Sequence, residues 1–304
     1  MTPLVSVILP TYNRATTLAR AVNSVLNQTF ADFELIIIDD GSTDDTPAVL
    51  RQFSSAGNVK VVPASHRGCA PARNLGVSQA QGRYLAFQDS DDEWLPHKLE
   101  RALAALEHTG PDTGVFYSDM IRIFPDGGAT AMTAAEVVPG RLINAATLDY
   151  QPLGIGIQST VIKRHCFETV GGFDEALPRF IDLELFIRLA ARFRFVHCRE
   201  TLAKYYFGQG ISTDRAALVA ARRHLIRKYH RQLANPRCHL AQQYLHLAVA
   251  LQNNGEKLAS LRCELQALFT SPWHPRIRQD ALALLNRRGQ ALAARFRRSP
   301  VISR

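Results

Sequence analysis

The sequence predicts an α/β protein whose mainly parallel sheet is covered by helices on both faces and is followed by a basic helical extension. Strand-length apolar runs alternate with segments of helical periodicity over the first 120 residues. Such alternation is typical of a parallel sheet that is buried on both faces. The charge is also divided unevenly, because residues 1–219 hold 20 basic and 24 acidic groups whereas residues 220–304 hold 16 and 3. The two parts are therefore expected to do different work.

The expected elements of the first 120 residues follow from their periodicity. Val5–Leu9 is a buried-strand run, and apolar residues recur at helical spacing over Thr17–Gln28. Strand Leu35–Ile38 precedes a helix that starts at Thr46 and Pro47, where proline suits the first helical position. The later elements are strand Val59–Val62, helix Ala72–Gln81, strand Tyr84–Phe87, a helix with Leu99, Leu103 and Leu106, and strand Val115–Tyr117.

From about residue 120 the pattern is mixed, and beyond Ser212 it is helical, with breaks near 235–236, 253–255 and 271–275. The expected elements before Ser212 are short strands at Met120–Phe124 and Ser159–Lys163, helix Ile181–Ala191, and strands Phe195–His197 and Leu202–Phe207. We therefore expect an α/β domain over 1–215, with halves 1–120 and 121–215, and a helical extension over 216–304.

Composition excludes several classes of protein. No run of 18 apolar residues indicates a membrane-spanning helix, and the N-terminus reads as a first strand without the basic region of a signal peptide. The five cysteines are scattered and form no Cys-x-x-Cys pair, which fits reduced thiols in a cytoplasmic protein. His66, His97 and His197 form no ligand pattern.

Three expected strand ends carry polar clusters, at residues 10–13, 39–42 and 89–92. Because ligands of parallel sheets bind at the carboxyl ends of the strands, these clusters should share one crevice. Asp89, Asp91 and Asp92 lie together, and an all-oxygen set favours Mg²⁺ or Mn²⁺, ions that commonly hold phosphate. The alternative is a structural turn, with Asp92 capping a helix that starts near Pro96.

Five motifs in order resemble the family 2 glycosyltransferases, which have a Rossmann-like GT-A fold and invert the anomeric configuration of a nucleotide-activated sugar. The motifs are VSVILPTYNR (5–14), SVLNQTF (24–30), IIIDDGSTD (36–44), ARNLG (72–76) and FQDSDDEW (87–94). A weaker resemblance continues through GGFDEALPRFIDLEL (171–185) to about residue 212.

The resemblance implies site residues. Asp40 would accept hydrogen bonds from the nucleobase or ribose, Arg73 would lie near the base and diphosphate, and Asp91 would bind a Mn²⁺ or Mg²⁺ ion held by the diphosphate. Asp89 would lie near the ribose, and Asp182 would be the catalytic base. The other implied nucleotide-sugar contacts are Pro10, Thr11, Tyr12, Asn13 and Ser90.

Two features leave these roles open. Taken alone, Asp182 is an acid favoured in a first helical turn by the helix dipole, and Asp174, Glu175 and Glu184 are its nearest competitors as base. Many relatives also carry a Tyr-Arg-x-His-like segment whose histidine helps to hold the metal or diphosphate. Residues 204–212 read KYYFGQGIS and contain no histidine, so Gln209 and Lys204 are alternatives.

The resemblance implies a metal-dependent glycosyltransferase, with a UDP-sugar as favoured donor and a glycan or lipid-linked acceptor, in the synthesis of a cell-envelope polysaccharide or glycolipid. The alternative function is a non-catalytic nucleotide-sugar-binding or scaffold protein. A Rossmann-type dehydrogenase is opposed by the absence of Gly-x-Gly-x-x-Gly after the first strand, and no nucleic-acid-binding motif is present.

The basic extension predicts attachment to anionic membrane lipids at the inner face of the cell membrane, because each lysine or arginine near such a surface contributes about 1 kcal/mol. The densest clusters are Arg222, Arg223, Arg227, Lys228 and Arg231, and Arg295, Arg297 and Arg298. The alternatives are solvated helices, packing on the acidic domain, and a homodimer contact.

Overall fold

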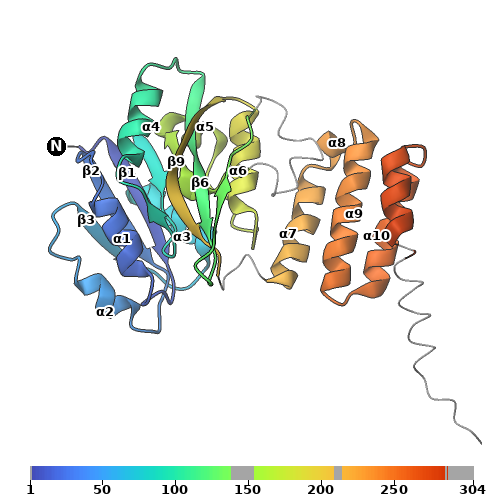
Figure 1. Cartoon of the computed structure of the whole chain (residues 1–304), viewed down its shortest axis with the longest axis horizontal. Coiled ribbons are helices and arrows are strands. Elements are labelled where there is room, and N and C mark those ends of the chain that lie inside the picture. The colour runs from blue at the N-terminus through green and yellow to red at the C-terminus, as the bar shows by residue number, and fades with distance from the viewer. Residues whose placement is uncertain (1, 138–153, 209–213, 285, 287–304) are drawn as a thin grey trace, which may run out of the picture. The chain divides into compact units, whose positions relative to one another are not determined.

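A computed structural model describes residues 2–137, 154–208, 214–284 and 286 of the chain (Figure 1). These residues belong to two compact units, an α/β unit up to Gly208 and a helical unit from Asp214 onward.

One sheet forms the centre of the α/β unit, with strand order β3-β2-β1-β4-β8-β6-β9-β5 and with β7 paired to β6. Strands β3, β2, β1 and β4 are parallel to one another, β8 is antiparallel to β4 and β6, and β9 is parallel to β6. The strands are β1 Val5–Thr11, β2 Phe33–Asp39, β3 Val59–Pro63, β4 Tyr84–Phe87, β5 Glu93–Trp94, β6 Thr113–Ile123, β7 Ala129–Met132, β8 Thr160–Lys163 and β9 Arg194–Tyr206.

Helices cover both faces of this sheet. The helices of the α/β unit are α1 Leu18–Leu26, α2 Thr46–Arg51, α3 Cys69–Gln79, α4 Lys98–Glu107, α5 Arg164–Val170 and α6 Ile181–Ala190. Helices α1, α2 and α4 pack against the alternate β1 and β2 side chains Val5, Val7, Leu9, Leu35 and Ile37. Helix α3 packs on the opposite face against Ile36 and Ile38. A Cβ atom on Gly76 of α3 would lie 2.4 Å from Ile8 Cγ2, so glycine allows this close approach of α3 to β1.

Several sequence predictions of element boundaries were wrong. The strands predicted at Val115–Tyr117 and Met120–Phe124 are one strand, β6, and those predicted at Phe195–His197 and Leu202–Phe207 are one strand, β9. Register shifts between β6 and β9 near Ser118 interrupt their alternation, which explains the apparent breaks. Strands β5 and β7 and helix α5 were not predicted, because they are short or exposed.

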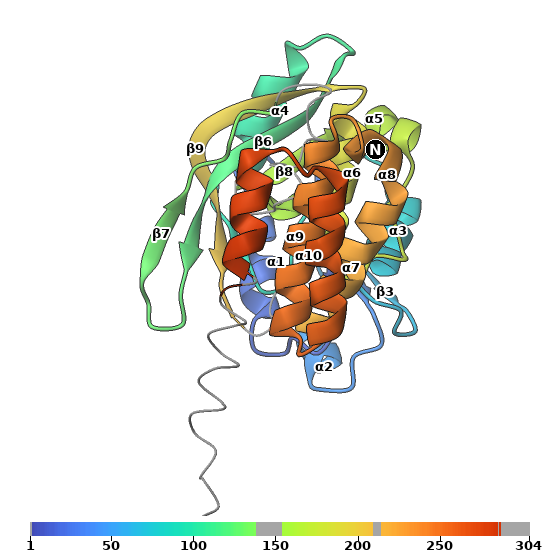
Figure 2. The ribbon, with the colours of Figure 1, turned by 90° about the vertical axis from the view of Figure 1, so that its right-hand side faces the viewer.

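The helical unit contains α7 Arg215–Lys228, α8 His230–Leu233, α9 Arg237–Asn253 and α10 Lys257–Thr270, followed by a helical segment at 275–284. Helix α9 contacts both α7 and α10 (Figure 2). The side chain of Asp214 caps α7 by accepting from the Ala217 amide at 3.0 Å. The predicted helical extension and its breaks near 235 and 254 are confirmed. No helix in the described residues combines the length and the hydrophobicity that crossing a bilayer requires.

Candidate active site

The polar loops that follow β1, β2 and β4 lie side by side, as the sequence predicts. Thr11 of β1 is in register with Asp39 of β2, and the Asp40 amide donates to the Thr11 carbonyl at 2.9 Å. On the other side of β1, the Gln88 amide donates to the Ile8 carbonyl at 3.0 Å, at the start of the acidic loop. The crevice at the carboxyl ends of these strands is the candidate site.

The loop after β1 is fixed by Asn13, whose φ of 51° lies in the left-handed region that asparagine tolerates. The Asn13 amide donates to Ser42 Oγ at 3.0 Å, and its side-chain oxygen accepts from the Thr43 amide at 2.8 Å. Asn13 therefore joins the loops after β1 and β2. Pro10 and Thr11 are buried in the floor of the crevice, and the Thr11 hydroxyl has no hydrogen-bond partner among the described residues.

Asp40 is buried beneath the loop that precedes α3. Its two carboxylate oxygens accept from the backbone amides of Arg67 at 3.0 Å and Gly68 at 2.8 Å. His66 Nδ1 lies 2.9 Å from Asp40 Oδ2, and the His66 ring stacks on Tyr12 with 3.8 Å between ring centroids. Tyr12 and Asp40 therefore meet at His66.

His66 is a site residue that sequence reasoning missed, since it was set aside as an ordinary histidine. The available signal was its place just after β3, at a fourth parallel strand end beside those that carry the polar clusters.

Arg73 is the buried cation of the crevice. It projects from α3 and forms an ion pair with Asp89. Burial opposes its charge, but the neighbouring Cys69 and the negative charges of Asp89 and Asp182 raise the pKa of Arg73. Asp182, from the distant helix α6, therefore lies close enough to act electrostatically on the same guanidinium as Asp89.

The negative charge of Asp91 is less fully balanced by a nearby cation than that of Asp89. Burial and the neighbouring charge of Asp89 raise the pKa of Asp91, and the facing cation, Arg14, lies 3.5 Å away. Arg20 donates to the Asp91 backbone carbonyl rather than to its carboxylate. Because carboxylate oxygens are the ligands that hard divalent cations prefer, Asp91 fits a Mg²⁺ or Mn²⁺ ligand. No group of three or more His, Cys, Asp or Glu side chains with the arrangement of a metal site occurs in the described residues, so phosphate oxygens would have to supply further ligands.

Asp92 is structural and does not cap α4. Its carboxylate accepts from the Tyr206 amide at 2.9 Å and from Gln158 Nε2 at 2.8 Å, whereas His97 occupies the cap position of α4. Burial, together with Asp89 and Asp91, raises the pKa of Asp92 well above its usual value. Asp92 thus ties the acidic loop to the end of β9, and the alternative interpretation in which it caps a helix near Pro96 was wrong.

Ser90 and Trp94 hold this acidic loop in place. The Ser90 carbonyl accepts from Thr17 Oγ1 at 2.9 Å. Trp94 is buried beneath this loop, and its indole nitrogen donates to the Gln158 carbonyl at 2.9 Å.

Asp182 lies in the first turn of α6, where its Oδ1 accepts from the Leu183 amide at 2.9 Å. Phe180, two residues before Asp182, has a φ of 62°. A left-handed conformation at a bulky residue is uncommon and is found most often at functional sites.

The nearest competitors of Asp182 have other partners. Glu184 is fully buried and both of its oxygens accept from Arg188 Nε, at 2.9 and 3.0 Å. Glu175 pairs with Arg67 at 3.0 Å and accepts from Asn74 at 3.0 Å, and Asp174 accepts from the Ala176 amide at 3.1 Å. Of Asp174, Glu175, Asp182 and Glu184, Asp182 is the one whose negative charge raises the pKa of Arg73.

Of the two residues offered in place of the missing histidine, Lys204 pairs with Glu93 at 2.8 Å. Gln209 lies outside the described residues. Arg20 takes a position near the same segment, with its guanidinium carbon 3.6 Å from the centre of the Tyr206 ring.

Known proteins resemble this chain in sequence and in fold. The family model described as glycosyl transferase family 2 matches residues 6–158, which is half of the chain. Among curated relatives, the Escherichia coli UDP-Glc:alpha-D-GlcNAc-diphosphoundecaprenol beta-1,3-glucosyltransferase WfgD is 40% identical over 104 residues, which are 34% of this chain and 41% of that protein. The chain spans less than half the length of the curated relatives it matches.

Two solved structures share the fold. Staphylococcus aureus TarS 1–349 in complex with UDP-GlcNAc has a TM-score of 0.64 and 20% identity, and the match covers 90% of this chain and 82% of that one. The mannosyltransferase PcManGT from Pyrobaculum calidifontis, in complex with GDP-Man and Mn²⁺, has a TM-score of 0.58 and 18% identity, and the match covers 97% and 81% of the two chains. The predicted GT-A fold is therefore confirmed.

Proposed function

Because the chain belongs to glycosyl transferase family 2, we propose that it transfers a sugar, with inversion, from a nucleotide-diphosphate sugar to a glycan or lipid-linked acceptor during synthesis of a cell-envelope polysaccharide or glycolipid. The observation that carries this proposal is one buried cation, Arg73, that forms an ion pair with Asp89 and also feels the charge of Asp182. This supports a single site for the carboxylates to which we assign donor binding and the catalytic base.

The donor would lie along the edge of the sheet, with UDP as the favoured nucleotide. Tyr12 presents an aromatic face for the base, and 37% of this residue is exposed even in its stack with His66. Asp40 Oδ1 accepts one backbone amide, whereas Oδ2 accepts another and also lies 2.9 Å from His66 Nδ1, so Oδ1 keeps a further acceptor position for the base or ribose. Arg73 pairs with Asp89 and lies within electrostatic range of Asp182, and its positive charge would attract the diphosphate.

Mn²⁺ or Mg²⁺ would be held by Asp91 together with diphosphate oxygens, in keeping with the Mn²⁺ found with the structurally similar PcManGT. When bound, such an ion supplies Lewis-acid stabilisation of the leaving diphosphate. Asp91 would fix the position of that charge beside the diphosphate.

Asp182 would act as general base. The acceptor hydroxyl oxygen attacks the anomeric carbon from the face opposite the diphosphate and forms the new glycosidic bond. Its proton passes to the Asp182 carboxylate, and the bond to the diphosphate oxygen breaks, with its electron pair leaving on the nucleoside diphosphate. One displacement inverts the anomeric configuration, so no protein nucleophile is needed.

The alternative of a non-catalytic binding or scaffold protein is not favoured by these findings. A protein that had lost transfer would be free to lose its base and acidic loop. Here Asp182 is retained within electrostatic range of Arg73, and the acidic loop is tied down by Asp92. We place the enzyme in the cytoplasm, with its basic helical unit at the inner face of an anionic membrane.

Asp182→Asn tests the proposed base. We expect donor affinity to change little and transfer to fall by about 10²–10⁴-fold, because the amide keeps the side-chain volume and loses the basicity. Asp174→Asn is the matched control, since Asp174 lies on the same segment and is engaged with the Ala176 amide. Transfer by Asp182→Asn at the parent rate, or an equal loss in Asp174→Asn, would assign the base elsewhere.

A further inference from the structure

Helix α10 buries polar side chains and exposes several large apolar ones. The residues that it buries are Ser260, Glu264 and Ala267. The Ser260 hydroxyl donates to the Ala248 carbonyl of α9 at 2.6 Å, which fixes this polar face inward. An amphipathic helix in a bundle normally buries its apolar stripe and exposes its charges.

Several large apolar side chains of α10 and of the turn after it are exposed. Leu258 is 77% exposed, Phe269 83% and Trp273 86%. Of the eight large apolar residues exposed in the described part of the chain, five lie between 258 and 282, the other two being Leu265 and Leu282. Clustered exposure of this kind marks an interaction surface, whereas single exposed apolar residues need no explanation.

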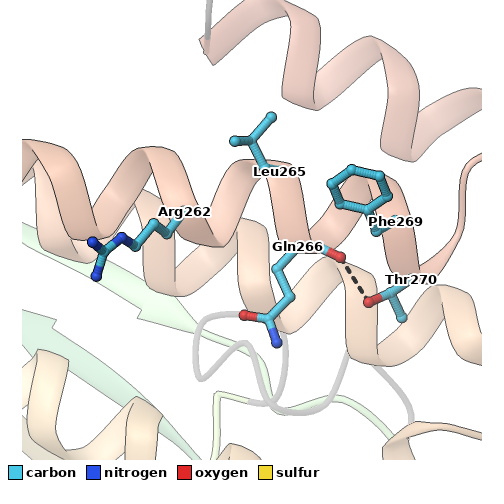
Figure 3. Close-up of a pocket in the computed structure, with 5 residues that line it drawn as sticks. All are labelled: Arg262, Leu265, Gln266, Phe269 and Thr270. Carbon is cyan, nitrogen blue, oxygen red and sulfur yellow. Dashed lines mark hydrogen bonds between the residues drawn. The ribbon is translucent and has the colours of Figure 1, made fainter.

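The outer surface of α10 is hollowed beside these residues. An open hollow of about 390 Å³ is lined by Arg262, Leu265, Gln266, Phe269 and Thr270. In Figure 3, Leu265 and Phe269 stand on the same side of the helix, and Arg262 lies one turn before Leu265 and Gln266. Arg262 thus lies beside the apolar stripe that Leu265 and Phe269 form.

The charge around this stripe is positive. Lys257, Arg262, Arg276 and Arg278 are exposed on residues 257–284, against one exposed acid, Asp280, which lies 3.9 Å from Arg276. Two copies of this face would bring like charges together, so the charge pattern favours an anionic partner over a second copy of the chain.

The basic residues of α7 (Arg222, Arg223, Arg227 and Lys228) are less suited to such a contact. Arg223 pairs with Glu256 at 3.0 Å, and no described residue of α7 is a large exposed apolar side chain. Helix α7 offers charge alone, whereas α10 offers charge beside aromatic and aliphatic anchors. The charge count along the sequence singled out the cluster from Arg222 to Arg231 and a second one at Arg295, Arg297 and Arg298, which lies outside the described residues, whereas the structure points to α10.

We propose that α10 and the turn after it form a membrane-contact face, with Leu258, Leu265, Phe269 and Trp273 in the interfacial layer of an anionic bilayer. Arg262, Arg276 and Arg278 then pair with the lipid phosphates. This inference rests on the proposed membrane location of the helical unit and specifies the surface. Arginine beside tryptophan and phenylalanine is the combination that interfacial helices use.

Tryptophan fluorescence tests the contact directly, because the chain has two tryptophans in opposite environments. Trp94 is 2% exposed and Trp273 is 86% exposed. On titration of the full chain with phosphatidylglycerol-containing vesicles at low salt, we expect a blue shift in emission and quenching by brominated lipid. The Trp94→Phe variant, in which Trp273 is the sole tryptophan, should show both changes undiminished. Absence of both changes in that variant overturns the proposal.

Co-sedimentation with the same vesicles tests the residues. The double variant Phe269→Ser/Trp273→Ser should bind at least about tenfold more weakly, because two interfacial aromatic side chains are lost. Val249→Ser, at a residue on α9 that is 40% exposed, is the matched control and should bind like the parent. Parent binding should weaken in high salt and be lost on neutral phosphatidylcholine vesicles.

Two outcomes identify another occupant. If the parent is a dimer that Phe269→Ser/Trp273→Ser makes monomeric, and neither binds vesicles, the face is a contact between copies and the proposal is wrong. Equal vesicle binding by the parent and the double variant assigns the contact to other residues and is also contrary to it. Transfer to a soluble acceptor reports the proposed enzymatic function separately, and we expect it to be unchanged in the double variant.

Discussion

Lys98 is a buried ammonium group whose removal should stabilise the protein. It is the first residue of α4 and is fully buried, with Nζ 4.9 Å from the centre of the Trp94 ring and 5.8 Å from that of Phe116. Nζ has no hydrogen-bond partner among the described residues. Burial lowers the pKa of Lys98 from 10.5 to about 7.

The sign of the effect follows from proton linkage. Between pH 7 and 10.5 the unfolded chain holds a proton on Lys98 that the folded protein has lost, so stability rises with pH across this window by at most about 1.4 kcal/mol per pH unit. Below the folded pKa the protein bears the full cost, about 5 kcal/mol for this displacement of the pKa. Cation–π contact with Trp94 contributes about 1–2 kcal/mol in the other direction. Lys98→Met should therefore raise the free energy of unfolding by about 2–4 kcal/mol near pH 7.

The assay is urea denaturation followed by the fluorescence of Trp94, which reports on the α/β unit, at pH 7.5 and 9.5. The advantage of Lys98→Met over the parent should shrink by about 2–3 kcal/mol between these pH values. Lys60→Met, at an exposed lysine on β3 of the same unit, should show no such pH dependence. Destabilisation by Lys98→Met at both pH values, or an advantage that does not change with pH, would refute the assignment of a desolvated ammonium group.

Two further substitutions examine the crevice. Asp91→Ala should abolish the enhancement of UDP binding by Mn²⁺, as measured by calorimetry. Without metal, UDP should bind to this variant no more weakly than to the parent, because a repelling carboxylate has been removed. If Mn²⁺ still enhances UDP binding to the variant, Asp91 is not a metal ligand. Arg73→Met should weaken UDP binding at least about tenfold and cost about 3–5 kcal/mol of stability in urea denaturation, because the partly buried Asp89 loses its cation. Arg67→Met breaks the exposed pair with Glu175 and should cost less than about 1 kcal/mol, so equal losses in the two variants would contradict the buried role of Arg73.

The strand core and the acidic loops could be predicted because their signals are local. Each central strand is a short apolar run, and each run ends in polar residues that the parallel register brings to one edge. The position of Asp89 beside β1 follows from that register alone. The long strands β6 and β9 could not be predicted whole, because register shifts between them break the alternation that marks a strand.

Contacts between distant residues account for the features that the sequence did not reveal. Nothing near Asp92 in the chain indicates that its carboxylate binds the Tyr206 amide, 114 residues away. The place of His66 beside Asp40 and Tyr12 depends on three separate loops. The charge of residues 220–304 was apparent from composition, but which helix presents apolar anchors depends on which face α9 covers.

The electrostatics of the crevice link donor and metal binding. Asp89, Asp91 and Asp182 contribute three carboxylates, of which Asp89 is directly paired with Arg73 and Asp91 has Arg14 at 3.5 Å. A nucleoside diphosphate adds negative charge to this region, and like charges resist being brought together in a site removed from water. A divalent cation held by Asp91 and the diphosphate would reduce this repulsion beyond what Arg73 supplies, because part of the charge of Arg73 is already balanced by Asp89. Donor and cation should therefore bind as one coupled unit, with each raising the affinity of the other by the same factor.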